Sequence, residues 1–146
     1  MPIPQIEKTL TALAGEFLVA GQLCMRKYLA SLTLKNYPKV DIFCLNPRTQ
    51  KQVPIQVKTK RGGNAYYVPE DIALTDPPFV FVYIHANEDV DYYIIPAKDV
   101  AALSGKERDE HVRTHPNSKK EQPRMLSIKN IDGRTYKNRW DLLGLD

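Results

Sequence analysis

Three polar side chains in the first half of the chain have the types and spacing of a chemical site. Gln56 and Lys58 alternate with Ile55 and Val57, and because successive side chains of a strand point to opposite faces, the two polar groups share one face. Asp41 lies on the other arm of a predicted hairpin, where strand pairing can bring its carboxylate beside them. A half-exposed structural strand explains the alternation of Gln56 and Lys58 equally well.

Asp41 is surrounded in the sequence by apolar residues, a setting in which a carboxylate is costly unless a cation, a proton or a hydrogen-bond donor compensates it. A functional site and a structural ion pair with Lys58 both meet that demand. Glu16 is a further candidate, because it lies beside the apolar stripe of a predicted helix and can lean over the edge of a sheet. Geometry alone favours an ordinary solvent-facing carboxylate at this position.

The elements that must position these residues follow from periodicity. Large apolar residues recur at steps of three, four and seven over residues 6–28, which predicts an amphipathic helix with the stripe Ile6, Leu10, Leu13, Phe17, Cys24 and Tyr28. Runs rich in β-formers predict strands over residues 31–34, 40–45, 52–59, 79–84, 91–95 and 125–128. Short helices are expected over residues 96–103 and 138–143, and the polar stretch over residues 104–123 is expected to be partly helical and partly mobile. The order predicts an α/β fold with a mixed central β-sheet flanked by helices.

The composition is that of one ordinary globular domain, expected to cover residues 1–146, with 42% hydrophobic and 26% charged residues. No apolar run approaches the roughly 20 residues that span a bilayer, and the first residues do not resemble a signal peptide, so we expect a cytoplasmic protein with no membrane partner. Cys24 and Cys44 lie in apolar patterns, which favours buried free thiols over a disulfide or a zinc site.

The net charge of +4 permits binding to a polyanion without requiring it. Lys58, Lys60 and Arg61 follow the candidate strand, and further basic residues enrich the C-terminal third: Lys119, Lys120, Arg124, Arg134, Lys137 and Arg139. A solvated basic surface explains the C-terminal group equally well. Tyr66 and Tyr67 can stack on bases or sugars, or pack against neighbouring strands.

His111 and His115 are four residues apart and can share a helix face as metal ligands. Pro116 and the polar neighbours favour instead a surface segment that ends there.

The runs Gly15 to Ala20, Val40 to Phe43 and Ile55 to Thr59 together resemble the PD-(D/E)xK nuclease superfamily, which has the restriction-endonuclease-like fold. Within the superfamily, the motifs most resemble those of the small single-domain members, such as the Holliday-junction resolvases. The resemblance covers Gly15 to Thr59, and the later elements fit it less specifically.

The resemblance implies a site in which Glu16 and Asp41 hold one or two Mg²⁺ ions, with help from the main-chain carbonyl of Val57, and in which Mn²⁺ can substitute. Lys58 would orient or activate the attacking water. Gln56 replaces the carboxylate that is usual in the motif, and its amide oxygen can ligate Mg²⁺ without contributing charge.

The implied function is a metal-dependent endonuclease that hydrolyses phosphodiester bonds in DNA, structure-directed or nonspecific, with RNA left open as a substrate. Lys60, Arg61, Tyr66 and Tyr67 are the candidate nucleic-acid contacts. The alternatives are a noncatalytic nucleic-acid-binding module that lost activity through Gln56, and an interaction protein on the same fold. A homodimer is expected by analogy with the superfamily.

Overall fold

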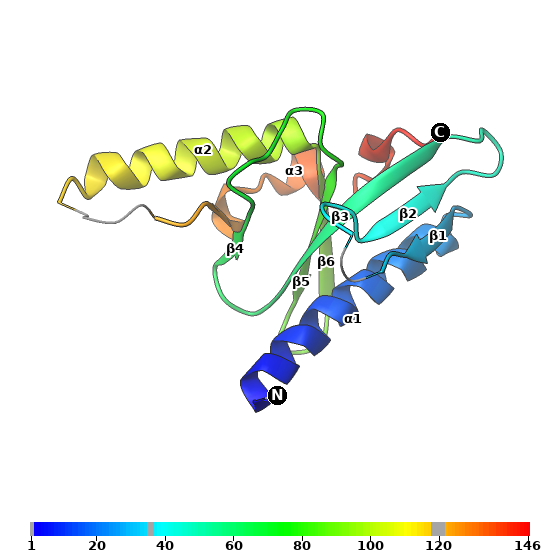
Figure 1. The fold of residues 1–146 in the computed structure, drawn as a ribbon, viewed down its shortest axis with the longest axis horizontal. Coiled ribbons are helices and arrows are strands. Elements are labelled where there is room, and N and C mark those ends of the chain that lie inside the picture. The colour runs from blue at the N-terminus through cyan, green and yellow to red at the C-terminus, as the bar shows by residue number, and fades with distance from the viewer. Residues whose placement is uncertain (1, 35–36, 118–121) are drawn as a thin grey trace.

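The computed structural model describes residues 2–34, 37–117 and 122–146 (Figure 1). Its centre is a five-stranded sheet in the order β1-β2-β3-β5-β6. The strands are β1 (Leu29–Leu32), β2 (Ile42–Leu45), β3 (Gln52–Arg61), β5 (Phe79–Ile84) and β6 (Val90–Ile95). Neighbours are antiparallel except β3 and β5, which run parallel. The predicted α/β class, with a mixed central sheet flanked by helices, is confirmed.

The helices differ in length from the prediction. They are α1 (Ile3–Met25), α2 (Ala97–Thr114), α3 (Gly133–Tyr136) and the 3-10 helices η1 (Ile128–Asn130) and η2 (Trp140–Leu143). The helix expected over residues 96–103 therefore continues to Thr114, into the stretch that was expected to be only partly helical. Two short strands, β4 (Ala65–Tyr67) and β7 (Met125–Ser127), pair with each other in a separate sheet. Among the described residues, no helix is both long and apolar enough to cross a membrane.

The sheet carries a hydrophobic core on each face. Val80 and Val82 of β5 pack in the core that α1 covers, while Phe79 and Phe81 pack in the core that contains residues of β4, α2 and β7. All four side chains are fully buried. The prediction that this strand is buried on both faces is therefore confirmed.

Helix α1 packs on the sheet with a different face from the one that its apolar spacing predicts. Its buried residues are Gly15, Val19 and Leu23, whereas Leu10 and Phe17 of the predicted stripe are 58% and 59% exposed. The reason is steric: Gly15 lies so close to β3 that only a residue without a side chain fits there. The side of α1 that carries this glycine is therefore the side that approaches the sheet.

The two cysteines differ in exposure, although both are free thiols. Cys44 of β2 is buried, as predicted. The prediction of a buried thiol at Cys24 is wrong, because Cys24 belongs to the exposed side of α1.

Candidate functional site

Asp41 lies where β2 and β3 separate. Strand β2 begins at Ile42, opposite Ile55 of β3, and the backbone N–H of Asp41 donates to the carbonyl of Ile55 at 2.8 Å. Two residues further along β3, the backbone N–H of Val57 donates to the Asp41 carboxylate at 2.7 Å. The side chain thus takes the place that a strand carbonyl would occupy, and this bond holds the carboxylate against β3.

Beyond Ile55, β3 has an open edge. Residues 56–61 pair with β5 on one side, and in the described part of the chain no strand pairs with 57–61 on the other. Because the backbone N–H of Gln56 donates to Pro78 on the β5 side, the next peptide groups turn the opposite way. The N–H and the carbonyl of Val57 therefore both face the open edge, where Asp41 lies.

Gln56 is held on the β5 side of the strand. Its side chain is buried, and its amide nitrogen donates to the carbonyl of Pro77 at 2.9 Å. The bond occupies the nitrogen of the amide, so only the amide oxygen has the chemistry of a metal ligand. The structure therefore brings Asp41, Gln56 and Val57 to one short stretch of β3, with Gln56 tethered towards the edge opposite Asp41.

An ion pair that the sequence did not predict connects the loops on the two sides of Gln56. The ammonium of Lys39, just before β2, lies 3.0 Å from the carboxylate of Asp76, which itself accepts a hydrogen bond from the backbone of Ala73 just before β5. The two donors hold the pKa of Asp76 below its ordinary value. No periodic signal predicts this contact, because it joins two loops rather than two regular elements.

Lys58 lies two residues beyond Gln56 on the same face of β3 and is half-buried. It lines a groove of about 1130 Å³ between the N-terminal half of α1 and the end of β3 with β4. The other lining residues are Pro4, Glu7, Lys8, Leu10, Thr11, Ala12, Ala14, Thr59, Lys60, Arg61, Tyr66 and Tyr67. Four of these thirteen groove residues are basic and one is acidic, so the groove suits an anionic ligand.

The two tyrosines of the predicted nucleic-acid surface have different environments. Tyr66 is only 2% exposed, its ring packs edge-on against Phe81, and its hydroxyl donates to the carbonyl of Val82. Tyr66 is therefore a packing residue, and the expectation that its ring stacks on a base is corrected. Tyr67 is 62% exposed, so its ring is accessible to a ligand.

Glu16 is half-buried and follows Gly15, which lies close to Thr59 of β3. A Cβ atom added at Gly15 would lie 1.7 Å from the hydroxyl of Thr59. This close approach places the backbone of Glu16 next to the part of β3 that carries Thr59.

The donor set suits Mg²⁺ by atom type. Glu16 and Asp41 offer carboxylates, Val57 a carbonyl and Gln56 an amide oxygen, and Mg²⁺ prefers oxygen ligands and retains waters. Among the described residues, no three His, Cys, Asp or Glu side chains form a group that could hold a metal. A site here would thus rest on two carboxylates and two neutral oxygens, so it offers less negative charge than a site in which residue 56 were a carboxylate.

The basic residues of the C-terminal third are largely committed to other contacts. Arg124 donates to Ser104 and to the carbonyl of Ala101, and Arg139 forms an ion pair with Asp141. Lys119 and Lys120 lie outside the described residues.

His111 of α2 and His115, the residue that follows the helix, form a pair at the surface. The rings of His111 and His115 stack on each other at the end of the helix, with centroids 4.3 Å apart. This agrees with the surface interpretation of the sequence.

No family model matches the chain, and neither a curated protein nor a solved structure matches it.

Proposed function

We propose that this chain is a metal-dependent endonuclease with its site at the open edge of β3. The observation that carries the proposal is the bond from the Val57 N–H to the Asp41 carboxylate, next to Lys58 and the basic groove. The proposal is also compatible with the α/β fold, since the PD-(D/E)xK resemblance implies a mixed central sheet flanked by helices. A cytoplasmic location is proposed with it and agrees with the two free thiols.

The proposed metal ligands are Glu16, Asp41, the Val57 carbonyl and the Gln56 amide oxygen. A bound Mg²⁺ would neutralise the charge that develops on the phosphate during hydrolysis. Asp41 contributes a carboxylate whose orientation is fixed by its bond to Val57. Lys58, which carries an ammonium on the groove side of the strand, donates to the attacking water or to the phosphate oxygens.

The groove provides the proposed substrate contacts. Lys60 and Arg61 follow Lys58 along β3 and can pair with backbone phosphates, while the exposed ring of Tyr67 can stack on a base or a sugar. None of these contacts reads a base sequence, so the proposed substrate is DNA recognised by its structure or nonspecifically. Single-stranded or folded RNA offers the same phosphates and belongs among the substrates to be tested.

One observation favours a second candidate, a nucleic-acid-binding module without catalysis. The Gln56 amide is buried, neutral and tethered to Pro77. If that tether keeps the amide oxygen away from a metal, the groove would still bind phosphates through Lys58, Lys60 and Arg61, with a strong dependence on salt.

The test is cleavage of supercoiled plasmid, branched DNA and single-stranded RNA in Mg²⁺, Mn²⁺ and EDTA. The informative variant is Asp41→Asn, since the asparagine side-chain oxygen can still accept the Val57 N–H while the charge is lost. Lys58→Met removes the ammonium and keeps the aliphatic stem. We expect the parent to cut in a metal-dependent way and both variants to lose roughly a hundredfold or more in rate.

The matched control is Lys51→Met, which removes an exposed lysine from the turn before β3. Full activity in Asp41→Asn would refute the site. Retention of the parent on DNA at low salt, without cutting in either metal, would favour the binding module, and the absence of both would refute a nucleic-acid role.

A further inference from the structure

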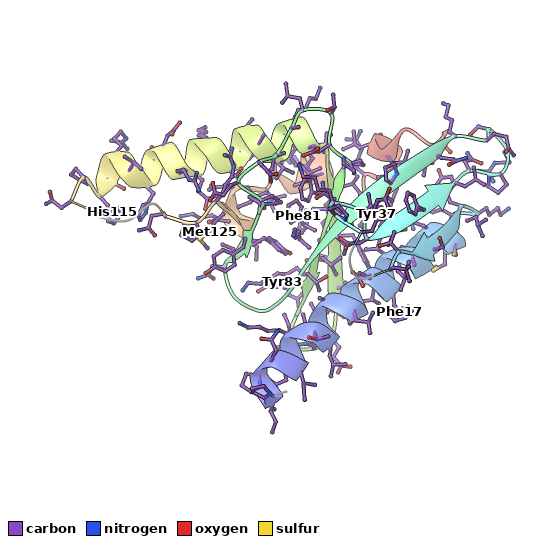
Figure 2. All side chains as sticks on the ribbon, viewed as in Figure 1. Phe17, Tyr37, Phe81, Tyr83, His115 and Met125 are labelled. Atoms are coloured by element: carbon purple, nitrogen blue, oxygen red, sulfur yellow. The ribbon has the colours of Figure 1, made fainter. Side chains whose placement is uncertain are left out.

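Helix α1 has two apolar sides: one packs on the sheet, and the other is largely exposed and meets the core only at its edge, through Ala20. The face that packs is formed by Gly15, Val19 and Leu23. Phe17 lies two residues from both Gly15 and Val19, which corresponds to about 200° around a helix. It therefore points away from the sheet, as Figure 2 shows, and it is 59% exposed.

The second face has the spacing of a coiled-coil seam. Its residues alternate steps of three and four without interruption, and we call them the α1 seam: Ile3, Ile6, Leu10, Leu13, Phe17, Ala20 and Cys24. Steps of three and four sustained over about three heptads are typical of helices that pack against another helix along a narrow strip. A single buried face on the sheet does not require this second repeat.

The large side chains at the N-terminal end and the centre of the seam are accessible in the single chain, whereas Leu13 and Ala20 are half-buried and Ala20 also packs against the core. Ile3, Leu10 and Phe17 are 72%, 58% and 59% exposed, and Ile6 is 39% exposed. Figure 1 shows α1 as the outermost layer on its side of the sheet, with its N-terminal end extending past the strands. A row of large apolar side chains along one exposed helix face indicates an interaction surface.

We infer that the occupant of the α1 seam is the α1 seam of a second copy, packed antiparallel. The two halves of the seam have complementary sizes: the N-terminal half carries Ile3, Ile6 and Leu10, and the C-terminal half carries Ala20 and Cys24, with Gly21 beside them. An antiparallel pair places each bulky half on the small half of the other copy. A parallel pair would place bulky on bulky and small on small, which leaves the C-terminal end poorly filled.

The heptad positions also define the register. In antiparallel coiled coils the first apolar position of one heptad packs on the fourth of its partner. This rule pairs residues of one copy with those of the other as Ile6 with Cys24, Leu10 with Ala20, and Leu13 with Phe17. The arrangement is closed and two-fold symmetric, so it ends at a dimer.

The area of the seam indicates how strongly two copies should associate. Residues 3–24 span about 32 Å, and a strip about 10 Å wide along them covers roughly 300 Å² per copy. A stable interface usually buries about 800 Å² per partner. The dimer should therefore dissociate on dilution, with a dissociation constant on the order of micromolar rather than nanomolar.

The experiment is sedimentation velocity of the whole chain from about 1 to about 300 μM under reducing conditions, a range that brackets the expected dissociation constant. We expect the parent to shift from monomer to dimer across this range. Phe17→Lys and Ile6→Lys, each of which introduces a charge into the seam without touching the groove, should stay monomeric throughout. The control is Val112→Lys, which changes an apolar side chain of equal exposure, 59%, on α2 and should dimerise like the parent.

Circular dichroism checks that the lysine variants are folded, because each must show the helix content of the parent. If one variant fails to fold, the other carries the test. A parent that stays monomeric at the highest concentration would overturn the inference, and so would a dimer that survives both substitutions.

Disulfide cross-linking tests the antiparallel register of the two helices. Under mild oxidation Ile6→Cys should form a covalent dimer through the introduced thiol of one copy and Cys24 of the other, while the parent, whose two Cys24 thiols lie far apart in the antiparallel pair, should not. A parent that cross-links through Cys24 alone would refute the antiparallel register. None of these measurements involves cleavage, so they test the inference separately from the proposed nuclease activity, even though Leu10 belongs to both the seam and the groove.

Discussion

Gly15 of α1 and Thr59 of β3 are in such close contact that a Cβ atom at residue 15 would lie 1.7 Å from the Thr59 hydroxyl oxygen and 2.7 Å from its Cβ. The contact determines how α1 lies on the sheet, because a residue with a side chain does not fit between the α1 backbone and the Thr59 side chain. It also positions Glu16, the next residue, relative to the open edge of β3. The hydroxyl of Thr59 is buried and has no hydrogen-bond partner among the described residues, so packing rather than polar bonding holds this contact.

Gly15→Ala should therefore destabilise the protein, although alanine has the higher helix propensity. Overpacking typically costs about 1–3 kcal/mol, which exceeds the gain of about 1 kcal/mol from the propensity. The control is Gly21→Ala on the same helix, where an added Cβ meets nothing within 4 Å and the propensity gain should raise the free energy of unfolding. Urea unfolding measures both. If both substitutions changed the free energy of unfolding by the same amount and in the same direction, the structure around Gly15 would have to adjust to the added methyl group.

Gln56→Glu tests whether the candidate site binds a metal. Without Mg²⁺ the substitution should lower the free energy of unfolding by about 1–3 kcal/mol, because the Pro77 carbonyl loses its donor and a carboxylate is buried beside it. If Glu16 and Asp41 hold Mg²⁺ here, the added charge strengthens binding, so about 10 mM Mg²⁺ should raise the Tm of the variant more than that of the parent.

The control for that comparison is Gln52→Glu, which places the same charge at an exposed position of β3. Thermal unfolding with Mg²⁺ and with EDTA gives the result. Identical Mg²⁺-induced shifts in all three proteins would argue against metal ligation at residue 56.

Local sequence signals predicted the part of the site that is built from neighbouring strands. The turn over residues 46–50 and the alternation of residues 55–58 define the β2–β3 hairpin, and its register brings Asp41 to Val57. Those signals suffice because hairpin pairing depends on residues that are close in the sequence.

The face that α1 presents to the sheet could not be predicted in the same way. Hydrophobic spacing reports which side chains favour burial, and it identified the seam of Leu10 and Phe17, whereas the sheet is approached through Gly15. Small residues such as Gly15 and Gly21 do indicate that the helix can lie close on a sheet, but which of them touches β3 depends on both surfaces together. The pairing of β4 with β7 was not predicted for a related reason. Each strand has only three residues, which is too short for a recognisable alternation, and the two strands lie far apart in the chain.

The ion pair between Lys39 and Asp76 predicts that the protein loses stability as the pH falls below the ordinary pKa of an aspartate. Hydrogen bonds from the backbone of Ala73 and from the Lys39 ammonium lower the pKa of Asp76 in the folded state. The ionised carboxylate therefore stabilises the fold at pH values above the unfolded pKa of about 3.9, and this contribution is lost as the pH falls through the lower folded-state pKa. In Asp76→Asn the free energy of unfolding should depend less steeply on pH below about 4.

Urea unfolding between about pH 2.5 and about pH 6 provides the measurement, because this range brackets the ordinary pKa of an aspartate. Asp109→Asn, which changes an exposed carboxylate of α2, should keep the acid dependence of the parent. If the free energy of unfolding of Asp76→Asn fell with decreasing pH as steeply as that of the parent, the ion pair with Lys39 would contribute nothing to stability.

The two cysteines should react at very different rates in the folded protein. Cys44 is only 2% exposed, and burial raises the pKa of its thiol to about 11, whereas Cys24 is exposed on α1. Because the thiolate is the reacting species, iodoacetamide at about pH 8 and about 1 μM protein should modify Cys24 and leave Cys44 intact until urea unfolds the chain. Peptide mapping by mass spectrometry identifies the site, and Cys24→Ser should abolish the fast reaction. Rapid labelling of Cys44 in the native protein would contradict the packing of β2 against α1, and with it the assignment of the seam to the outer side of the helix.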